Sequence, residues 1–154
     1  ANLIAGTPDF RSVENIQRAR TRGLGVSARV SMPGEVALRA GYTWLEADNL
    51  TAGTRLLRRP RHQATLDAWR ELGAGLSAGA GVTWTAQRED VHAATFATVD
   101  GEDFTVVRFY GAWDASERVS LKLRIENLLD ERYEEVHGYP ATGFGAFAGV
   151  ELRF

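Results

Sequence analysis

Hydrophobic and polar residues alternate along most of this chain. The last segment has an apolar face made of Phe144, Ala146, Ala148, Val150, Leu152 and Phe154. The same two-residue period runs through 36–44, 76–84 and 119–126. Since successive side chains of a strand point to opposite faces, this period predicts strands with one apolar and one polar face. No window supports a helix of more than about two turns, so the sequence predicts an all-β chain.

The predicted strands are joined by links that alternate between long and short. We expect strands at 1–4, 17–31, 35–48, 61–72, 76–88, 104–115, 119–127 and 144–154. The long links are 5–16, 49–60, 89–103 and 128–143, and the short links are 32–34, 73–75 and 116–118. Outer-membrane barrels have this alternation because their periplasmic turns are tight and their outer loops are extended. The pattern favours an antiparallel transmembrane β-barrel, with about eight strands in this chain.

Aromatic residues stand at both ends of the predicted apolar face. Tyr42, Trp44 and Trp84 lie near the long links, and Trp113 and Phe154 lie near the opposite end. Membrane barrels carry such an aromatic girdle at each interface, with an apolar band facing lipid between them. A soluble barrel would instead turn the apolar face inward and use the aromatics as core. A soluble β-barrel binding module therefore stays open as an alternative.

The composition excludes several classes of function. The chain has 154 residues, of which 25% are charged, with a net charge of −2 and no cysteine. This length corresponds to a single domain, and the charge balance lacks the basic surface of a nucleic-acid-binding protein. Without cysteine there is no disulfide scaffold, zinc knuckle or thiol nucleophile. The uncharged stretch 72–87 is too short and too rich in glycine for a membrane helix.

No motif for catalysis or for a cofactor stands out. His62, His92 and His137 share no metal-ligand spacing, and no nucleophile elbow surrounds a serine, so we expect neither a metal site nor an enzyme. Residues 23–28 and 73–78 match the dinucleotide fingerprint in form only, because no helix follows them. We interpret their glycines as small residues on the inward face of strands.

Arginines cluster near the long links, and two interpretations stay open. The cluster consists of Arg18, Arg20, Arg22, Arg55, Arg58, Arg59 and Arg61. It can contact anionic groups, either of lipid headgroups or of a ligand, since guanidinium groups pair with phosphate and carboxylate. Alternatively, it is a solvated rim without a partner.

Three segments of the chain resemble the TonB-dependent outer-membrane receptors. They are 127–133 together with the terminal Phe154, 56–62, and 15–23. The third segment departs from the family pattern, because Gly25 stands where a glutamate is usual. Within the family, residues 133–139 are most similar to the vitamin B12 (cobalamin) transporter branch.

The resemblance implies a barrel of about 22 strands with an N-terminal plug, in the outer membrane of a Gram-negative bacterium. Residues 1–154 would form one barrel segment, the C-terminal third, and the plug that contacts TonB would lie outside it. Such a receptor imports cobalamin, a siderophore or a similar scarce nutrient. About eight strands also suffice to close a small barrel, so a self-closed barrel with a structural role is the second possibility.

The resemblance also assigns roles to individual residues. Arg58 and Tyr139 match positions that contact the nutrient ligand. The last strand, with Val150, Leu152 and Phe154, matches the signal that the barrel-assembly machinery reads. Outer-membrane lipid and lipopolysaccharide are the surroundings expected for such a barrel.

Charged residues on the polar face need partners, because an unpaired buried charge is costly. If Trp113 opposes Leu121 in neighbouring strands, the same register sets Arg108 against Glu126. We therefore predict an ion pair between these last two residues.

Overall fold

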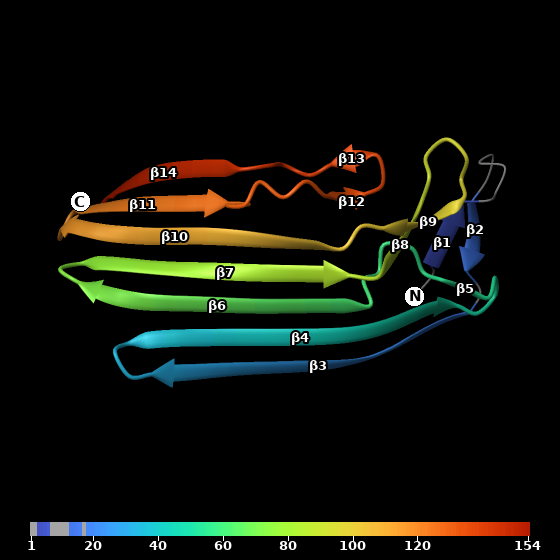
Figure 1. The fold of residues 1–154 in the computed structure, drawn as a ribbon, viewed down its shortest axis with the longest axis horizontal. Coiled ribbons are helices and arrows are strands. Elements are labelled where there is room, and N and C mark those ends of the chain that lie inside the picture. The colour runs from blue at the N-terminus through green and yellow to red at the C-terminus, as the bar shows by residue number, and fades with distance from the viewer. Residues whose placement is uncertain (1–2, 7–12, 17) are drawn as a thin grey trace.

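The computed structural model describes residues 3–6, 13–16 and 18–154, and seven long antiparallel strands dominate it (Figure 1). These strands are β3 (Ala19–Met32), β4 (Val36–Asn49), β6 (His62–Gly73), β7 (Leu76–Ala86), β10 (Phe104–Ser116), β11 (Val119–Glu126) and β14 (Gly145–Leu152). Each pairs with the next long strand along the chain. Among the described residues, none forms a helix of the length and hydrophobicity needed to cross a membrane. The all-β antiparallel prediction is confirmed.

Tight turns and long loops lie at opposite ends of the sheet (Figure 1). In the turn between β6 and β7, Gly73 and Gly75 have φ of +88° and +74°, which glycine adopts without steric cost. The long loops carry small strands of their own, which the alternation pattern did not predict. These are β5 (Thr54–Arg55), which pairs with β4, the hairpin of β8 (Arg88–Val91) and β9 (Thr98–Gly101), and the hairpin of β12 (Glu134–Val136) and β13 (Tyr139–Pro140).

The first predicted strand does not join the main sheet. In its place, β1 (Leu3–Gly6) pairs with β2 (Val13–Ile16) as a separate two-stranded sheet. The main sheet therefore has seven long strands where about eight were predicted. The short β1 takes its backbone hydrogen-bond partners from β2 and not from the main sheet. The described residues do not include 1–2, 7–12 and 17. These residues belong to the predicted strands 1–4 and 17–31 and to the predicted link 5–16.

The sheet is open in the described part of the chain. Its edge strands are β3 and β14, and they do not pair with each other. The alternative of a self-closed small barrel therefore does not match this fold. A strand edge as long as β3 leaves a row of backbone donors and acceptors without partners, which a larger barrel would satisfy with a further strand.

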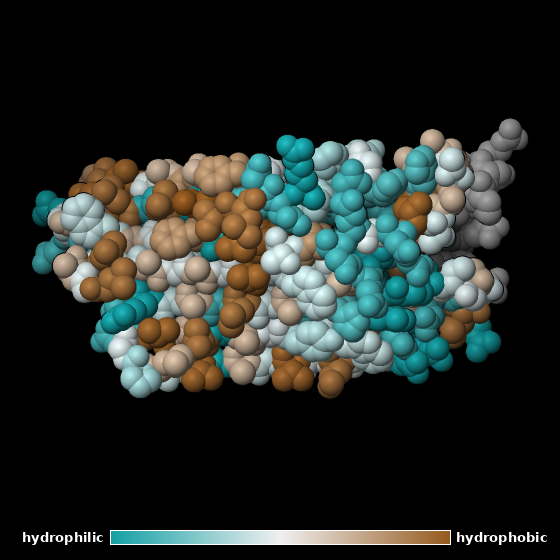
Figure 2. All heavy atoms as spheres, viewed as in Figure 1, coloured by the Kyte–Doolittle hydropathy of each residue, from teal (hydrophilic) through white to brown (hydrophobic). Residues whose placement is uncertain are grey.

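One face of the sheet is apolar and exposed. Leu24 on β3 is 61% exposed and Val150 on β14 is 65% exposed, whereas the buried apolar residues of the described chain are Ala47, Ala86 and Phe104. In Figure 2, apolar residues gather over the long strands, and hydrophilic residues gather over the loop end. A soluble module would bury such a face, so the exposed apolar surface does not fit the soluble β-barrel alternative.

Candidate functional site

Three polar side chains meet on the polar face of the sheet, from strands that are not neighbours. Arg108 and Tyr110 on β10 reach across β7 to Asp67 on β6. The Arg108 Nη2 atom donates a hydrogen bond of 2.7 Å to Asp67 Oδ2, and the Tyr110 hydroxyl donates one of 2.7 Å to Asp67 Oδ1. The strand between them presents Gly79 and Gly81 here. A Cβ atom on Gly79 would lie 2.5 Å from Tyr110 Cζ, and one on Gly81 would lie 2.6 Å from Arg108 Nε. Because these two glycines have no side chain, they leave the space on β7 through which Arg108 and Tyr110 reach Asp67.

The predicted ion pair of Arg108 with Glu126 is wrong, although the register behind it is confirmed. Trp113 lies opposite Leu121, as predicted. Arg108 turns the other way because Gly81 leaves its path to Asp67 free. Glu126 instead pairs with Arg124, at 3.5 Å.

Gly79→Val tests whether the missing side chain at Gly79 is needed for the Tyr110–Asp67 hydrogen bond. The added side chain must displace the Tyr110 ring from its hydrogen bond, and we expect a loss of about 1–3 kcal/mol in the free energy of unfolding. Gly149→Val is the matched control, because that glycine is on the polar face of β14 with no atom within 4 Å of the added Cβ. Urea unfolding of the whole receptor in lipid vesicles measures both. Equal losses of stability from the two substitutions would contradict the claim that Gly79 leaves the space that Tyr110 needs to reach Asp67.

A buried carboxylate joins three of the long loops. Asp90 is 0% exposed. It accepts hydrogen bonds from Arg58 Nε at 2.9 Å and from the backbone N–H groups of Val91 and His137, both at 2.8 Å. Burial alone would raise the pKa of Asp90, but these donors outweigh it and hold the pKa below its usual range. Asp90 therefore stays charged and ties the loop before β6 and the last loop to the β8–β9 hairpin.

Aromatic packing makes a second connection between the β8–β9 hairpin and the last loop. The Phe104 and Tyr133 rings stack with centroids 4.1 Å apart. The guanidinium carbon of buried Arg88 lies 5.6 Å from the centroid of Phe104, and Arg88 Nη2 donates to the backbone carbonyl of Glu134. Burial, followed by the nearby charge of Glu135, raises the pKa of Tyr133.

The segment 127–130 closes the base of the last loop. Asn127 is 2% exposed, and its backbone has a φ of +49°. Its amide nitrogen donates to the carbonyls of Glu131 and Thr142, at 2.9 and 3.3 Å, and its amide oxygen accepts from the Glu131 N–H at 2.9 Å. Asp130 accepts from the N–H of Phe144 at 2.9 Å. These bonds hold the two ends of the loop together.

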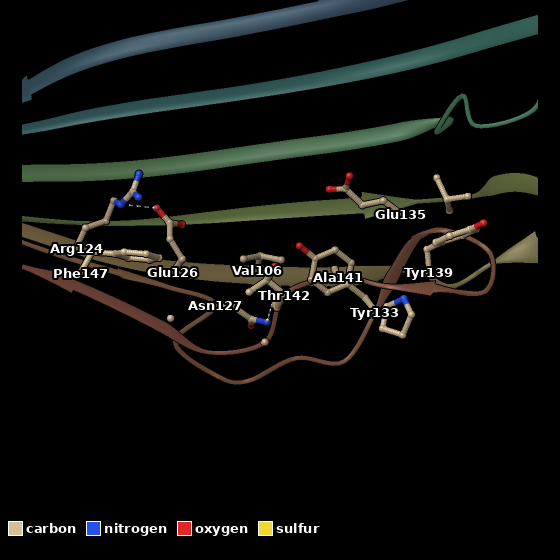
Figure 3. A pocket seen from close by; sticks show the side chains of 14 residues that line it. Val106, Arg124, Glu126, Asn127, Tyr133, Glu135, Tyr139, Ala141, Thr142 and Phe147 are labelled. Carbon is tan, nitrogen blue, oxygen red and sulfur yellow. Dashed lines mark hydrogen bonds and ion pairs between the residues drawn. The ribbon is translucent and has the colours of Figure 1, made fainter.

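A cavity of about 600 Å³ lies between this loop and the polar face of β10, β11 and β14 (Figure 3). Its walls include Val106, Arg124, Glu126, Asn127, Tyr133, Glu135, Tyr139 and Phe147. The guanidinium carbon of Arg124 lies 4.8 Å from the centroid of the Phe147 ring. The volume is within the range of about 300–1,000 Å³ that small-molecule sites occupy.

Residues 1–128 match the family described as "TonB dependent receptor-like, beta-barrel". This chain belongs to that family. The match covers well over half of the chain and agrees with the open antiparallel sheet and its outward apolar face. No curated protein matches the chain by sequence.

Several solved structures of transporters and import receptors resemble this receptor segment. The copper transporter OprC is 21% identical with a TM-score of 0.72, over 88% of this chain and 24% of that one. The siderophore receptor PiuA from Acinetobacter baumannii is 18% identical with a TM-score of 0.73, over 98% and 24%. The ferric-catecholate import receptor Fiu from E. coli K12 is 19% identical with a TM-score of 0.75, over 99% and 23%. The segment spans about a quarter of these chains, and at such identities the likeness establishes the fold alone.

The two residues that the resemblance assigned to the ligand occupy different places in the receptor segment. Tyr139 lines the cavity and is 69% exposed. Arg58 is not among the residues that line it, and its guanidinium is bound to Asp90. The residue that connects them is Asp90, since it also holds the backbone of His137, two residues before Tyr139. Sequence reasoning missed this carboxylate because nothing local distinguishes it from its neighbours.

The four aromatic residues of the predicted girdles that belong to strands lie on the apolar face of the receptor segment. Tyr42 and Trp84 flank Ala64 in one row, and Trp44 lies opposite His62 in the next row toward the loops. The Tyr42 hydroxyl and His62 Nδ1 are 2.7 Å apart. At the turn end, Trp113 is on the same face and exposed, and Phe154 ends the chain fully exposed.

Most arginines of the basic cluster have carboxylate partners in the receptor segment. The ion pairs are Arg20–Asp48, Arg22–Glu46, Arg55–Glu89, Arg58–Asp90 and Arg61–Glu46. The acidic residues come from neighbouring strands and loops. The arginine cluster therefore has less unpaired positive charge than its sequence alone indicates. Within the described ranges, no group of three His, Asp or Glu residues is arranged to hold a metal ion.

Proposed function

We propose that this chain is the C-terminal part of the barrel of a receptor that imports a scarce nutrient across the outer membrane of a Gram-negative bacterium. The observation that carries the proposal is the exposed apolar face of an open sheet that belongs to the TonB-dependent receptor family. The nutrient is cobalamin or a metal chelate such as a siderophore, with cobalamin supported by the resemblance of residues 133–139. TonB supplies the energy through a plug outside these 154 residues.

The apolar face contacts lipid, bounded by the two aromatic girdles. The register supports this boundary: the row of Leu24 and Trp44 is followed on the same face by Arg22–Glu46 and then by Arg20–Asp48. A change from apolar to ionic rows at an aromatic residue is typical of a membrane interface. The arginines therefore lie at the level of lipopolysaccharide headgroups.

The last strand serves assembly of the barrel. Val150 and Leu152 are apolar, exposed and aligned on one face of β14, and the exposed Phe154 follows two residues after the strand ends. The barrel-assembly machinery would recognise this strand through pairing along the edge of β14 that does not bind β11.

TonB-dependent uptake is the direct test of the import function. Cells that lack their other receptors and carry the whole receptor are given radiolabelled cobalamin or a panel of ferric siderophores. We expect accumulation of one of these nutrients that disappears when TonB is deleted. Uptake that persists without TonB, or no uptake of any of them, would reject the proposal.

Tyr139 and Arg58 are proposed as ligand contacts at the outer side of the barrel. Tyr139→Ala removes an exposed aromatic surface and is expected to weaken binding of the imported nutrient about 2- to 10-fold. Arg58→Ala removes a donor that also holds Asp90, so its effect on nutrient binding should be larger. Arg59→Ala, the neighbouring exposed arginine, is the matched control for charge. Binding to purified receptor by titration calorimetry measures all three, and three equal affinities would contradict the assignment.

A further inference from the structure

The cavity beneath the last loop has an excess of negative charge. Two carboxylates, Glu126 and Glu135, and one guanidinium, Arg124, line it. The Arg124 guanidinium is paired with Glu126 and lies over the Phe147 ring. The ion pairs of the described residues engage Glu126 and Glu134 but not Glu135. Within the described part of the chain, Glu135 is therefore a carboxylate at the cavity without a cationic partner.

Two tyrosine rings line the same cavity as that carboxylate. In Figure 3, Glu135, Tyr133 and Tyr139 lie together at the loop side of the cavity, and Arg124 and Phe147 lie at the other side. Tyr133 is held in place by its stack on Phe104. Tyr139 is largely exposed, so its ring remains open to a ligand. Aromatic faces attract cations through their negative quadrupole, most strongly where water is excluded.

We infer that this cavity binds an organic cation, a quaternary or protonated amine with an apolar body, between Glu135 and the rings of Tyr133 and Tyr139. The inference rests on the proposed function, since it places a cationic group on the nutrient or on a molecule that accompanies it through the barrel. A bare metal ion fits less well, because hard cations need about six oxygen ligands.

Binding of choline to the whole receptor tests the inference. Titration calorimetry or saturation-transfer NMR on the receptor in nanodiscs compares choline with 3,3-dimethyl-1-butanol, which has nearly the same shape and no charge. We expect choline to bind at least about tenfold more tightly than the alcohol. Glu135→Gln should weaken choline binding about tenfold, and Tyr139→Leu about threefold. Both are exposed positions, so the variants are expected to fold.

Glu117→Gln is the control, since that carboxylate is in the tight turn at the opposite end of the sheet. Equal affinities for choline and the alcohol, or an effect of Glu135→Gln no larger than that of Glu117→Gln, would overturn the inference. Binding of glucose in place of choline would do the same. TonB-dependent uptake without choline binding overturns the organic-cation site alone. Choline binding without uptake of any tested nutrient overturns the import function alone.

Discussion

Replacing Asp90 with alanine is expected to release the loops that this carboxylate joins. The substitution removes the buried acceptor of the half-exposed Arg58 guanidinium and of the His137 N–H, so each loses a charge-assisted hydrogen bond. Losing charge-assisted hydrogen bonds of this kind costs about 2–3 kcal/mol in local opening, with Arg58 contributing less because it is half-exposed. Hydrogen exchange should show protection of the His137 amide falling by roughly 30- to 150-fold.

Acid should have the same effect on the unsubstituted receptor. The pKa of Asp90 is lowered by folding, so its stabilisation is complete above its unfolded pKa of about 4 and is lost as pH falls through the folded value. The loops are therefore expected to stay joined at about pH 5 and to separate only below about pH 4. Asp100→Ala is the control, an exposed carboxylate in the same hairpin that should change protection by less than about threefold. Unchanged protection of His137 in Asp90→Ala would refute the role of this carboxylate.

Asn127→Ala is expected to be the most damaging single change at the base of the last loop. Three hydrogen bonds to the side chain disappear, from the Glu131 N–H and to the carbonyls of Glu131 and Thr142. Alanine must also adopt the φ of +49° that asparagine tolerates better. Together these terms predict a loss of about 2–4 kcal/mol in the free energy of unfolding, measured by urea unfolding of the whole receptor in lipid vesicles.

Two further variants separate the causes. Asn127→Gly removes the same hydrogen bonds but accepts the positive φ, so it should be less destabilising than Asn127→Ala by about 1 kcal/mol. Leu129→Ala changes an exposed residue in the same segment and should cost less than about 0.5 kcal/mol. A stability of Asn127→Ala equal to that of Leu129→Ala would show that the asparagine does not hold the loop.

The sequence by itself determined the strands and their two faces. Predicted and observed ends of the seven long strands agree within about two residues. The apolar face runs through Val82 and Leu121 as the alternation required. These features are local: the period of two belongs to the backbone of a strand, and glycines mark the turns where φ is positive. The order of neighbouring strands follows because each tight turn pairs adjacent segments.

Only the tertiary structure decided which charges meet. Arg108 pairs with Asp67 because two glycines on the intervening strand leave a path, and that path depends on the register of three strands at once. Asp90 binds both Arg58 and the backbone of His137 because loops that are far apart in the sequence lie next to one another in the fold. The cavity with Glu135 exists because the last loop lies over the polar face of the sheet. Such contacts join residues separated by tens of positions, and no pattern within one strand or loop encodes the partner on another.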